Sequence, residues 1–194
     1  MTGRSPHETP RYAIRRGRAQ DLVRLAEAER SAAVTYFAAL GSPAEIPEAM
    51  AADALEACLA AGLLWVATDR RDVPVGFLAA EVVDGHLFVK EMSVEREHQR
   101  AGLGRRLMQA AEDHARQAAC GALALTTDRL IPFNGPFYER LGFRAVAADH
   151  ATPGLRRRLA DEIAGGFDPQ RRILMTKPVA ALQPSATPLY RERI

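Results

Sequence analysis

Cysteine is scarce in this chain, and so are long apolar runs and any excess of charge of one sign. Cys58 and Cys120 are too few for a disulfide framework and lack the spacing of a metal site. Both lie in alanine-rich, helix-like stretches, so we interpret them as buried free thiols, which favours a cytoplasmic setting. The 26 basic and 24 acidic residues leave a net charge of +2, so bulk charge indicates no nucleic-acid partner.

Membrane and metal signals are also lacking. No apolar run approaches the roughly 18 residues that a membrane-spanning helix needs. Residues 1–10 are polar and have no apolar core of a signal peptide. No metal site is expected, because the histidines are scattered along the chain and do not form a ligand set. They include His86, His98, His114 and His150.

The length and composition are those of one globular domain. A chain of 194 residues with 47% hydrophobic and 26% charged residues can bury a proper core. We expect a loose tail at 1–10, a single domain over 11–177, and a proline-rich arm or tail over 178–194.

Hydrophobic periodicity predicts alternating strands and helices, and therefore an α+β fold. We expect a mixed, mostly antiparallel sheet with helices on both faces. The predicted strands cover 12–16, 63–67, 75–83, 86–94, 121–126, 142–146 and 171–176. The predicted helices cover 21–37, 45–61, 105–119, 135–140 and 153–164.

The most informative segment is a glycine turn, Gln99–Gly104, between a predicted strand and a predicted helix. Such a turn points unpaired N–H groups of a helix start at an anion, and glycine lets the backbone approach a phosphate closely. It is not a Walker loop, because no Gly-Lys-Ser/Thr follows, and it is not a dinucleotide fingerprint, because position 107 is Leu107 rather than glycine. Taken alone, it fits any pyrophosphate, or a ligand-free turn.

Two motifs together resemble the GNAT superfamily of N-acetyltransferases. Gln99-x-x-Gly102-x-Gly104 is similar to the loop that wraps the pyrophosphate of acetyl-coenzyme A in that family. The run Asn134–Phe143 is similar to the second signature, an Asn followed by a short helix ending in Tyr-x-x-x-Gly-Phe. The resemblance covers about residues 11–147. It implies a sheet of six to seven strands whose fourth and fifth strands splay apart to admit the cofactor.

The resemblance also implies which residues hold acetyl-CoA. Backbone N–H groups of the loop would face the pyrophosphate, and Arg106 would either add charge there or lie in solvent. The backbone of Met92 and Val94 would pair with the pantetheine arm, and one N–H would polarise the thioester carbonyl. The cofactor-binding residues expected on this basis are Met92, Val94, Gln99, Arg100, Ala101, Gly102, Leu103, Gly104, Arg105, Asn134 and Phe137.

Two residues are predicted to move protons. Tyr138 stands at the family's tyrosine position and would protonate the departing thiolate. Glu91 neighbours Met92 on the cofactor strand, and by strand alternation it points the opposite way. A partly desolvated carboxylate there would act as the base, through a water. Asp128 is the competing base, and a mechanism that uses water alone stays open.

The acceptor is the least visible part of the sequence. Segments 31–50 and 148–170 should flank the acceptor site, and Pro132 and Phe133 would line it. Further apolar walls, or else core residues, are Tyr36, Phe37, Trp65 and Phe77.

We expect acetyl transfer to a primary amine of a small molecule, by direct attack in a ternary complex. The alternatives are a protein or peptide N-acetyltransferase and a non-catalytic acyl-CoA-binding module. The C-terminal arm leaves a homodimer possible.

Overall fold

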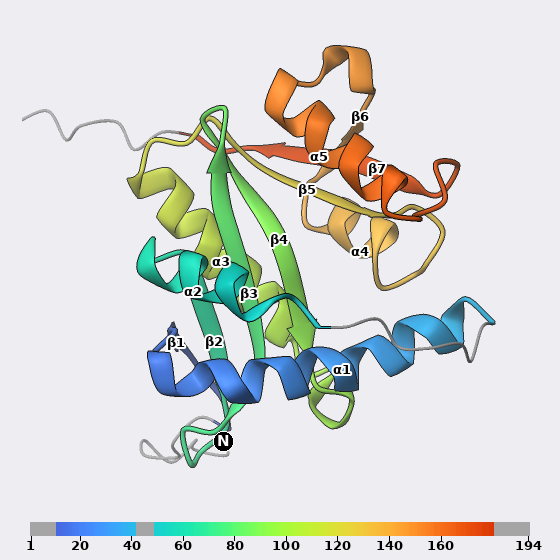
Figure 1. Ribbon diagram of the computed structural model, residues 1–194. Coiled ribbons are helices and arrows are strands. Elements are labelled where there is room, and N and C mark those ends of the chain that lie inside the picture. Colours follow the sequence, from blue (N-terminus) through green and yellow to red (C-terminus); the bar gives the residue numbers. More distant parts are fainter. Residues whose placement is uncertain (1–10, 42–48, 181–194) are drawn as a thin grey trace, which may run out of the picture.

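The computed structural model describes residues 11–41 and 49–180, which form a seven-stranded sheet in the order β1-β2-β3-β4-β5-β7-β6 (Figure 1). All neighbouring strands are antiparallel except β4 and β5, which are parallel. The strands are β1 (Ala13–Arg16), β2 (Leu64–Thr68), β3 (Pro74–Val83), β4 (His86–Val94), β5 (Ala122–Asp128), β6 (Arg144–Val146) and β7 (Arg172–Pro178). The α-helices are α1 (Leu22–Ala39), α2 (Ala52–Ala60), α3 (Leu103–Gln117), α4 (Gly135–Arg140) and α5 (Pro153–Ala164).

Helices cover both faces of the sheet, as the alternation of buried residues along the strands requires. On one face, α3 packs against a core that includes Trp65 and Leu107. On the other face, α1 and α2 cover a cluster around Phe77, and α5 covers one around Phe88. Figure 1 shows α1, α2 and α5 on the near side of the sheet and α3 behind it. Trp65 and Phe77 are therefore core residues and do not line an acceptor pocket.

The pairing between β4 and β5 is short, and this opens the sheet at its centre. Four residue pairs join them, from His86 with Ala122 to Val89 with Leu125. Immediately afterwards β4 carries a bulge, because Val89 pairs with Ala80 of β3 while Glu91 pairs with Ala79. Lys90 is the extra residue, and a bulge of this kind bends the strand and increases its twist. Beyond the bulge β4 and β5 are unpaired, which confirms the expected splay. We call this opening the seam.

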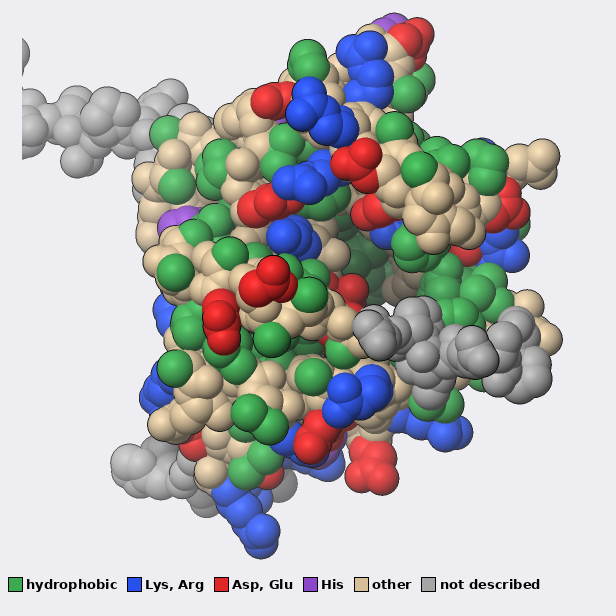
Figure 2. Space-filling model, in the orientation of Figure 1, with side chains coloured by type: hydrophobic (Ala, Val, Ile, Leu, Met, Phe, Trp, Pro, Cys, Tyr) green, Lys and Arg blue, Asp and Glu red, His purple; other side chains and the backbone are tan. Residues whose placement is uncertain are grey.

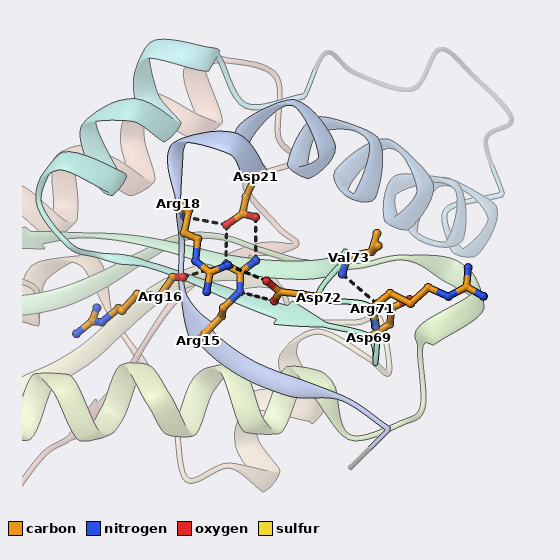
Figure 3. Close-up of polar contacts among 8 residues, drawn as sticks. All are labelled: Arg15, Arg16, Arg18, Asp21, Asp69, Arg71, Asp72 and Val73. Carbon is orange, nitrogen blue, oxygen red and sulfur yellow. Dashed lines mark hydrogen bonds and ion pairs between the residues drawn. The ribbon is translucent and has the colours of Figure 1, made fainter. Parts of the chain in front are cut away.

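Buried charges fix the start of α1 against the sheet. Arg15 of β1 donates to both carboxylate oxygens of Asp21, at 2.7 and 2.9 Å, and also reaches Asp72 in the β2–β3 turn (Figure 3). The Asp21 carboxylate accepts a further bond from the N–H of Arg18. Because these contacts join β1, the β2–β3 turn and the residues before α1, they set the direction in which α1 crosses the sheet.

One helix boundary predicted from the sequence is wrong in its described part. The pattern predicts a helix from residue 45, but 49–51 are not helical and α2 begins at Ala52. The N–H of Met50 is instead bonded to the carboxylate of Glu29, and Ala51 is extended as the residue before the helix. Residues 45–48 lie outside the described residues, as do the predicted tail 1–10 and most of the predicted arm, 181–194.

Two properties of the described residues bear on the partners of the chain. No helix among them is long and apolar enough to cross a membrane. Within 11–41 and 49–180, no group of three or more potential metal-ligating side chains comes together.

Candidate active site

The glycine loop leads into α3 with its backbone donors unpaired. Gly102 takes a left-handed conformation, with φ of 78°, as the residue before the helix, and Arg100 is also left-handed. Among the described residues, none accepts a hydrogen bond from the N–H groups of residues 100–105. These donors stand at the positive end of a fifteen-residue helix. The loop can therefore bind an anion such as a pyrophosphate.

The side chains of the loop have different tasks. Gln99 donates from Nε2 to the carbonyl of Val94 at 3.1 Å and accepts a bond from Thr35 of α1. It thus holds the loop against β4 and α1. Arg106 donates to the carbonyl of Tyr12 through both terminal nitrogens, so it braces β1. Arg100 and Arg105 are exposed beside the loop and carry charge there.

The seam presents unpaired backbone from β4. Glu95 directs its N–H toward β3, where it bonds the carbonyl of Val75. Backbone groups alternate sides along a strand, so the N–H groups of Val94 and Met92 point the other way, into the seam. No residue of β5 pairs with them. An extended ligand lying in the seam could pair with this edge as an added strand would.

The second motif lines the other side of the seam. A Cβ built on Gly104 would lie 3.4 Å from the ring of Phe137 and 3.6 Å from the side chain of Met92, so loop, α4 and β4 meet at this point. Asn134 precedes α4, and its side-chain amide makes no hydrogen bond to a described residue, not even as a helix cap. The amide is therefore available to a ligand.

Tyr138 occupies the centre of this arrangement. Its ring lies edge-on to Phe137 and Phe143, with centroids 5.2 and 5.7 Å away. Burial raises the pKa of the Tyr138 phenol, and the negative charge of Glu91 raises it further. The phenol therefore stays protonated at neutral pH. It is also a weaker acid than a free tyrosine. The difference between its pKa and that of a thiol is therefore larger than the difference between the reference values of about 10 and about 8.5.

Glu91 points to the α1 side of the sheet, opposite to Met92, as strand alternation predicted. Met92 packs against the α3 core, whereas Glu91 pairs in register with Ala79, whose side chain faces α1 and α2. The hydroxyl of Ser93 donates to Glu91 Oε1 at 2.7 Å. Burial raises the pKa of Glu91, while the bond from Ser93 works against that rise.

A second carboxylate, on α1, senses the charge of Glu91, and sequence reasoning missed it. Glu29 of α1 accepts the N–H of Met50 on both oxygens, each at 3.0 Å. Burial first, and then the charge of Glu91, raise the pKa of Glu29 to about 7. The sequence does hold a signal for its position. Glu29 comes four residues after the buried Leu25, and residues four apart lie on the same face of a helix.

The other charges on this side are already paired. Asp128 accepts Nε of Arg171 at 2.8 Å and the N–H groups of Leu130 and Ile131. Burial alone would raise the pKa of Asp128, but these donors, Arg171 above all, bring it below its usual value. Asp128 is therefore a weak base that holds the turn after β5.

Arg172 pairs with Glu162 of α5 at 2.7 Å, and both contact Thr126. Its guanidinium also lies over the ring of Phe167. Among the described residues, by contrast, no ion pair reaches Glu29 or Glu91. The α1 side of the sheet therefore holds two carboxylates without a direct ion pair among the described residues, although the charge of Arg172 still favours the ionised form of Glu91 and that of Arg30 the ionised form of Glu29.

Helix α5 covers part of the same face. It is fixed at its start by the N–H of Gly154 on Asp84, at 2.7 Å, and further along by Arg158 on Glu81, at 2.8 Å. Figure 2 shows a recess between the region of α5 and that of α1, with hydrophobic side chains on its floor. The segments 31–41, 49–50 and 148–170, predicted to flank the acceptor, lie around this side.

Comparisons with known proteins agree with this geometry. Residues 60–145 match the model of the acetyltransferase (GNAT) domain family. The fold is similar to that of the ribosomal-protein-S18-alanine N-acetyltransferase from Escherichia coli, with a TM-score of 0.63 and 18% identity over 91% of this chain and 98% of that one. It is also similar to the PaiA N-acetyltransferase from Thermoplasma acidophilum in complex with coenzyme A, with a TM-score of 0.67 and 17% identity over 86% and 98%.

A third structure is N-acetylglutamate synthase from Neisseria gonorrhoeae with coenzyme A and N-acetyl-glutamate, with a TM-score of 0.64 and 15% identity over 89% of this chain and 36% of that one. These enzymes act on different acceptors, so the likeness supports the fold and leaves the acceptor open. The domain-model match over residues 60–145, the splayed seven-stranded sheet and the two motifs around the seam together show that the chain has the fold of the GNAT acetyltransferases and is similar to that family.

Proposed function

We propose that the protein transfers the acetyl group of acetyl-CoA to the primary amine of a small molecule, by direct attack within a ternary complex. The observation that carries this proposal is Glu91, a carboxylate that makes no direct ion pair among the described residues, on the strand whose backbone at Met92 and Val94 is left unpaired at the seam. A site of this charge attracts an ammonium group and places it next to the opening where a thioester would lie.

The cofactor would be held along the seam. Loop N–H groups from Arg100 to Arg105 would bind its pyrophosphate, with Arg100 and Arg105 adding charge. The pantetheine arm would pair with the edge of β4 at Met92 and Val94, and the amide of Asn134 would bond it from the other side. Support for this ligand comes from the unpaired donors of the loop and from the similar structure that contains coenzyme A.

Catalysis would rest on positioning and on two proton transfers. A seam N–H of β4 would polarise the thioester carbonyl. A carboxylate with a raised pKa is needed to deprotonate the ammonium, and Glu91, predicted for this task from the sequence, lies at the seam. Tyr138 would donate its phenolic proton to the sulfur of the departing coenzyme A.

The charges around the acceptor side favour one class of acceptor. Arg171 and Arg172 are each paired with a carboxylate, so neither is available for the carboxylate of an amino acid. The anchoring of α5 at Asp84, Glu81 and Arg172 keeps that helix over the acceptor side, which favours a compact acceptor over a folded protein. We therefore expect small amines without a carboxylate next to the amino group.

The experiment is a screen of acceptors with release of free thiol as the readout. Purified protein with acetyl-CoA is given alkyl and arylalkyl amines, diamines, free amino acids and short peptides with free N-termini. Turnover with the simple amines at least tenfold above that with amino acids and peptides is the expected result. Preferred turnover of a peptide would replace the acceptor proposed here, and acetyl-CoA binding without any turnover would leave a non-catalytic binding module.

A further inference from the structure

Strand β3 runs past the end of β2 and leaves part of its edge without a neighbouring strand. The N–H of Ala80 bonds the carbonyl of Leu63 at 2.9 Å, just before β2 begins. Backbone groups alternate sides along a strand, so the N–H and the carbonyl of Val82 point to the same side as the N–H of Ala80. No described strand lies beside Val82 on that side. Figure 1 shows the β3–β4 hairpin projecting past α2 at this end of the sheet.

A groove follows this free edge between two helices. It is a cavity of about 390 Å³, lined by β3 and β4, by α2 on one face of the sheet and by α3 on the other. The α2 wall is formed by small side chains, including Ala57 and Ala61, so there is room beside the strand. A second copy of this chain would carry its β3 edge between the same two helices. The helices of two copies would therefore meet before their β3 edges could, and a single extended segment fits better.

The polar groups of the groove carry an excess of positive charge. Glu81 is shared by two cations, since Arg158 lies 2.8 Å from its Oε1 and Lys90 lies 3.8 Å from its Oε2. At 3.8 Å the Lys90 ammonium is too far away for a hydrogen bond, and it donates to no other described residue. His114 accepts Nη2 of Arg16 on Nδ1, at 3.0 Å, so the neutral ring carries its proton on Nε2. The groove therefore offers donors and positive charge to a ligand.

We propose that this groove binds an extended segment of a partner protein, which adds to β3 as an edge strand. An unpaired strand edge is a template for such pairing, and hydrogen bonds to the backbone of Val82 would hold the segment. The groove lies at the free edge of β3, whereas the seam lies between β4 and β5. The inference therefore goes beyond the proposed function and does not depend on acetyl transfer.

The two faces of the sheet favour different side chains in the added strand. Glu81 lies on the face of α2 and α5, together with Lys90, and an acidic side chain would complement that ammonium. Val82 lies on the opposite face with Ala80, which belongs to the α3 core. Its side chain is 57% exposed, so an apolar side chain could cover it. The partner segment should therefore alternate acidic and apolar residues.

The test is fluorescence anisotropy with short labelled peptides that are blocked at both ends. One peptide alternates valine with glutamate, and the other alternates valine with lysine. The wild type should bind the glutamate peptide about tenfold or more tightly than the lysine peptide, and Lys90→Gln should reduce that preference. Saturating coenzyme A should not displace the peptide, because the groove and the seam lie at different strand edges.

Two changes test the groove and the backbone pairing separately. Ala57→Trp fills the groove from α2 and should weaken binding about tenfold or more. Ala60→Trp is the matched control, because Ala60 is exposed on the same helix and does not line the groove. Methylation of alternate peptide amides tests the pairing. One of the two alternating patterns should block binding and the other should not, because only every second amide would face β3.

Four results would overturn the inference. The wild type may bind neither peptide, or both methylation patterns may have the same effect, which would mean that the peptide does not pair as a strand. Displacement by coenzyme A would place the peptide in the seam. Light scattering that shows a dimer, broken by Ala57→Trp and kept in Ala60→Trp, would assign the groove to a second copy of the chain.

Discussion

At the scale of single residues, Tyr138 offers the clearest test of the chemistry. Tyr138→Phe removes the phenolic proton donor and keeps the ring packing against Phe137 and Phe143. We expect kcat to fall by about 10²-fold, because the thiolate would leave without a positioned acid. The affinity for coenzyme A should stay within about twofold, since the loop and the edge of β4 that would bind the cofactor are unchanged. Turnover assays and calorimetric titration measure the two quantities.

Tyr12→Phe provides the matched control, because its hydroxyl bonds His98 at 3.0 Å, outside the seam. It should leave kcat near the wild-type value. If Tyr138→Phe turns over as fast as the wild type, the phenol has no part in the reaction.

The residues that sequence could predict are those inside contiguous motifs. Gly102 and Tyr138 each stand in a short pattern whose spacing carries the chemistry. Glu29 stands in no such pattern, and its contact with the N–H of Met50 depends on tertiary packing between segments distant in sequence. Asp128 shows the reverse: its position suggested a base, but a distant arginine, Arg171, takes up its carboxylate.

At the scale of elements, the start of α1 depends on the buried contact between Asp21 and Arg15. The donors around Asp21 outweigh the effect of burial and hold its pKa below the usual value near 4. A lowered pKa stabilises the fold above the unfolded-state pKa, and that stabilisation is lost as the pH falls through the folded-state value. Asp21→Asn should therefore cost on the order of 2 kcal/mol at pH 7, and less as the pH drops below about 4.

Urea unfolding at pH 7 and pH 2.5 measures this difference, with Asp149→Asn as the control, because that side chain is 78% exposed. The control should change stability by less than about 0.5 kcal/mol at either pH. A destabilisation by Asp21→Asn that is equal at both pH values would mean that packing, and not charge, anchors α1.

Helices with clear sequence signals at both ends were predicted with the correct first and last residues. Helices α4 and α5 begin at prolines or beside them, and Gly165 follows α5, so both matched their predicted bounds. The bulge at Lys90 had no local signal, because it is a property of how β4 pairs with β3. Since this bulge directly follows the last residue pair of β4 and β5, the splay could be predicted only from the family resemblance and not from the residues of β4.

At the scale of the whole molecule, the seam divides the sheet between β1–β4 and β5–β7. The two parts share four residue pairs between β4 and β5, and beyond these a ligand in the seam would touch both. Such a ligand binds the native protein and not the unfolded chain, because the donors of the loop and of β4 converge only in the fold. Ligand binding must then raise the melting temperature.

Coenzyme A at about 100 times its dissociation constant should stabilise the protein by about 2.7 kcal/mol, or roughly 5–11 °C for a chain of this length. Gly102→Asp should abolish the rise, since it puts a negative charge against the pyrophosphate. A Cβ at Gly102 meets no atom within 4 Å, so the variant meets no clash and its cost is the backbone strain of a non-glycine residue at φ of 78°, about 1–2 kcal/mol. Gly85→Asp is the matched control, with φ of 76° and equally open space in the β3–β4 turn, and it should respond like the wild type. A rise with NAD or ATP in place of coenzyme A would contradict the proposed cofactor, because the loop would then recognise a pyrophosphate of another kind.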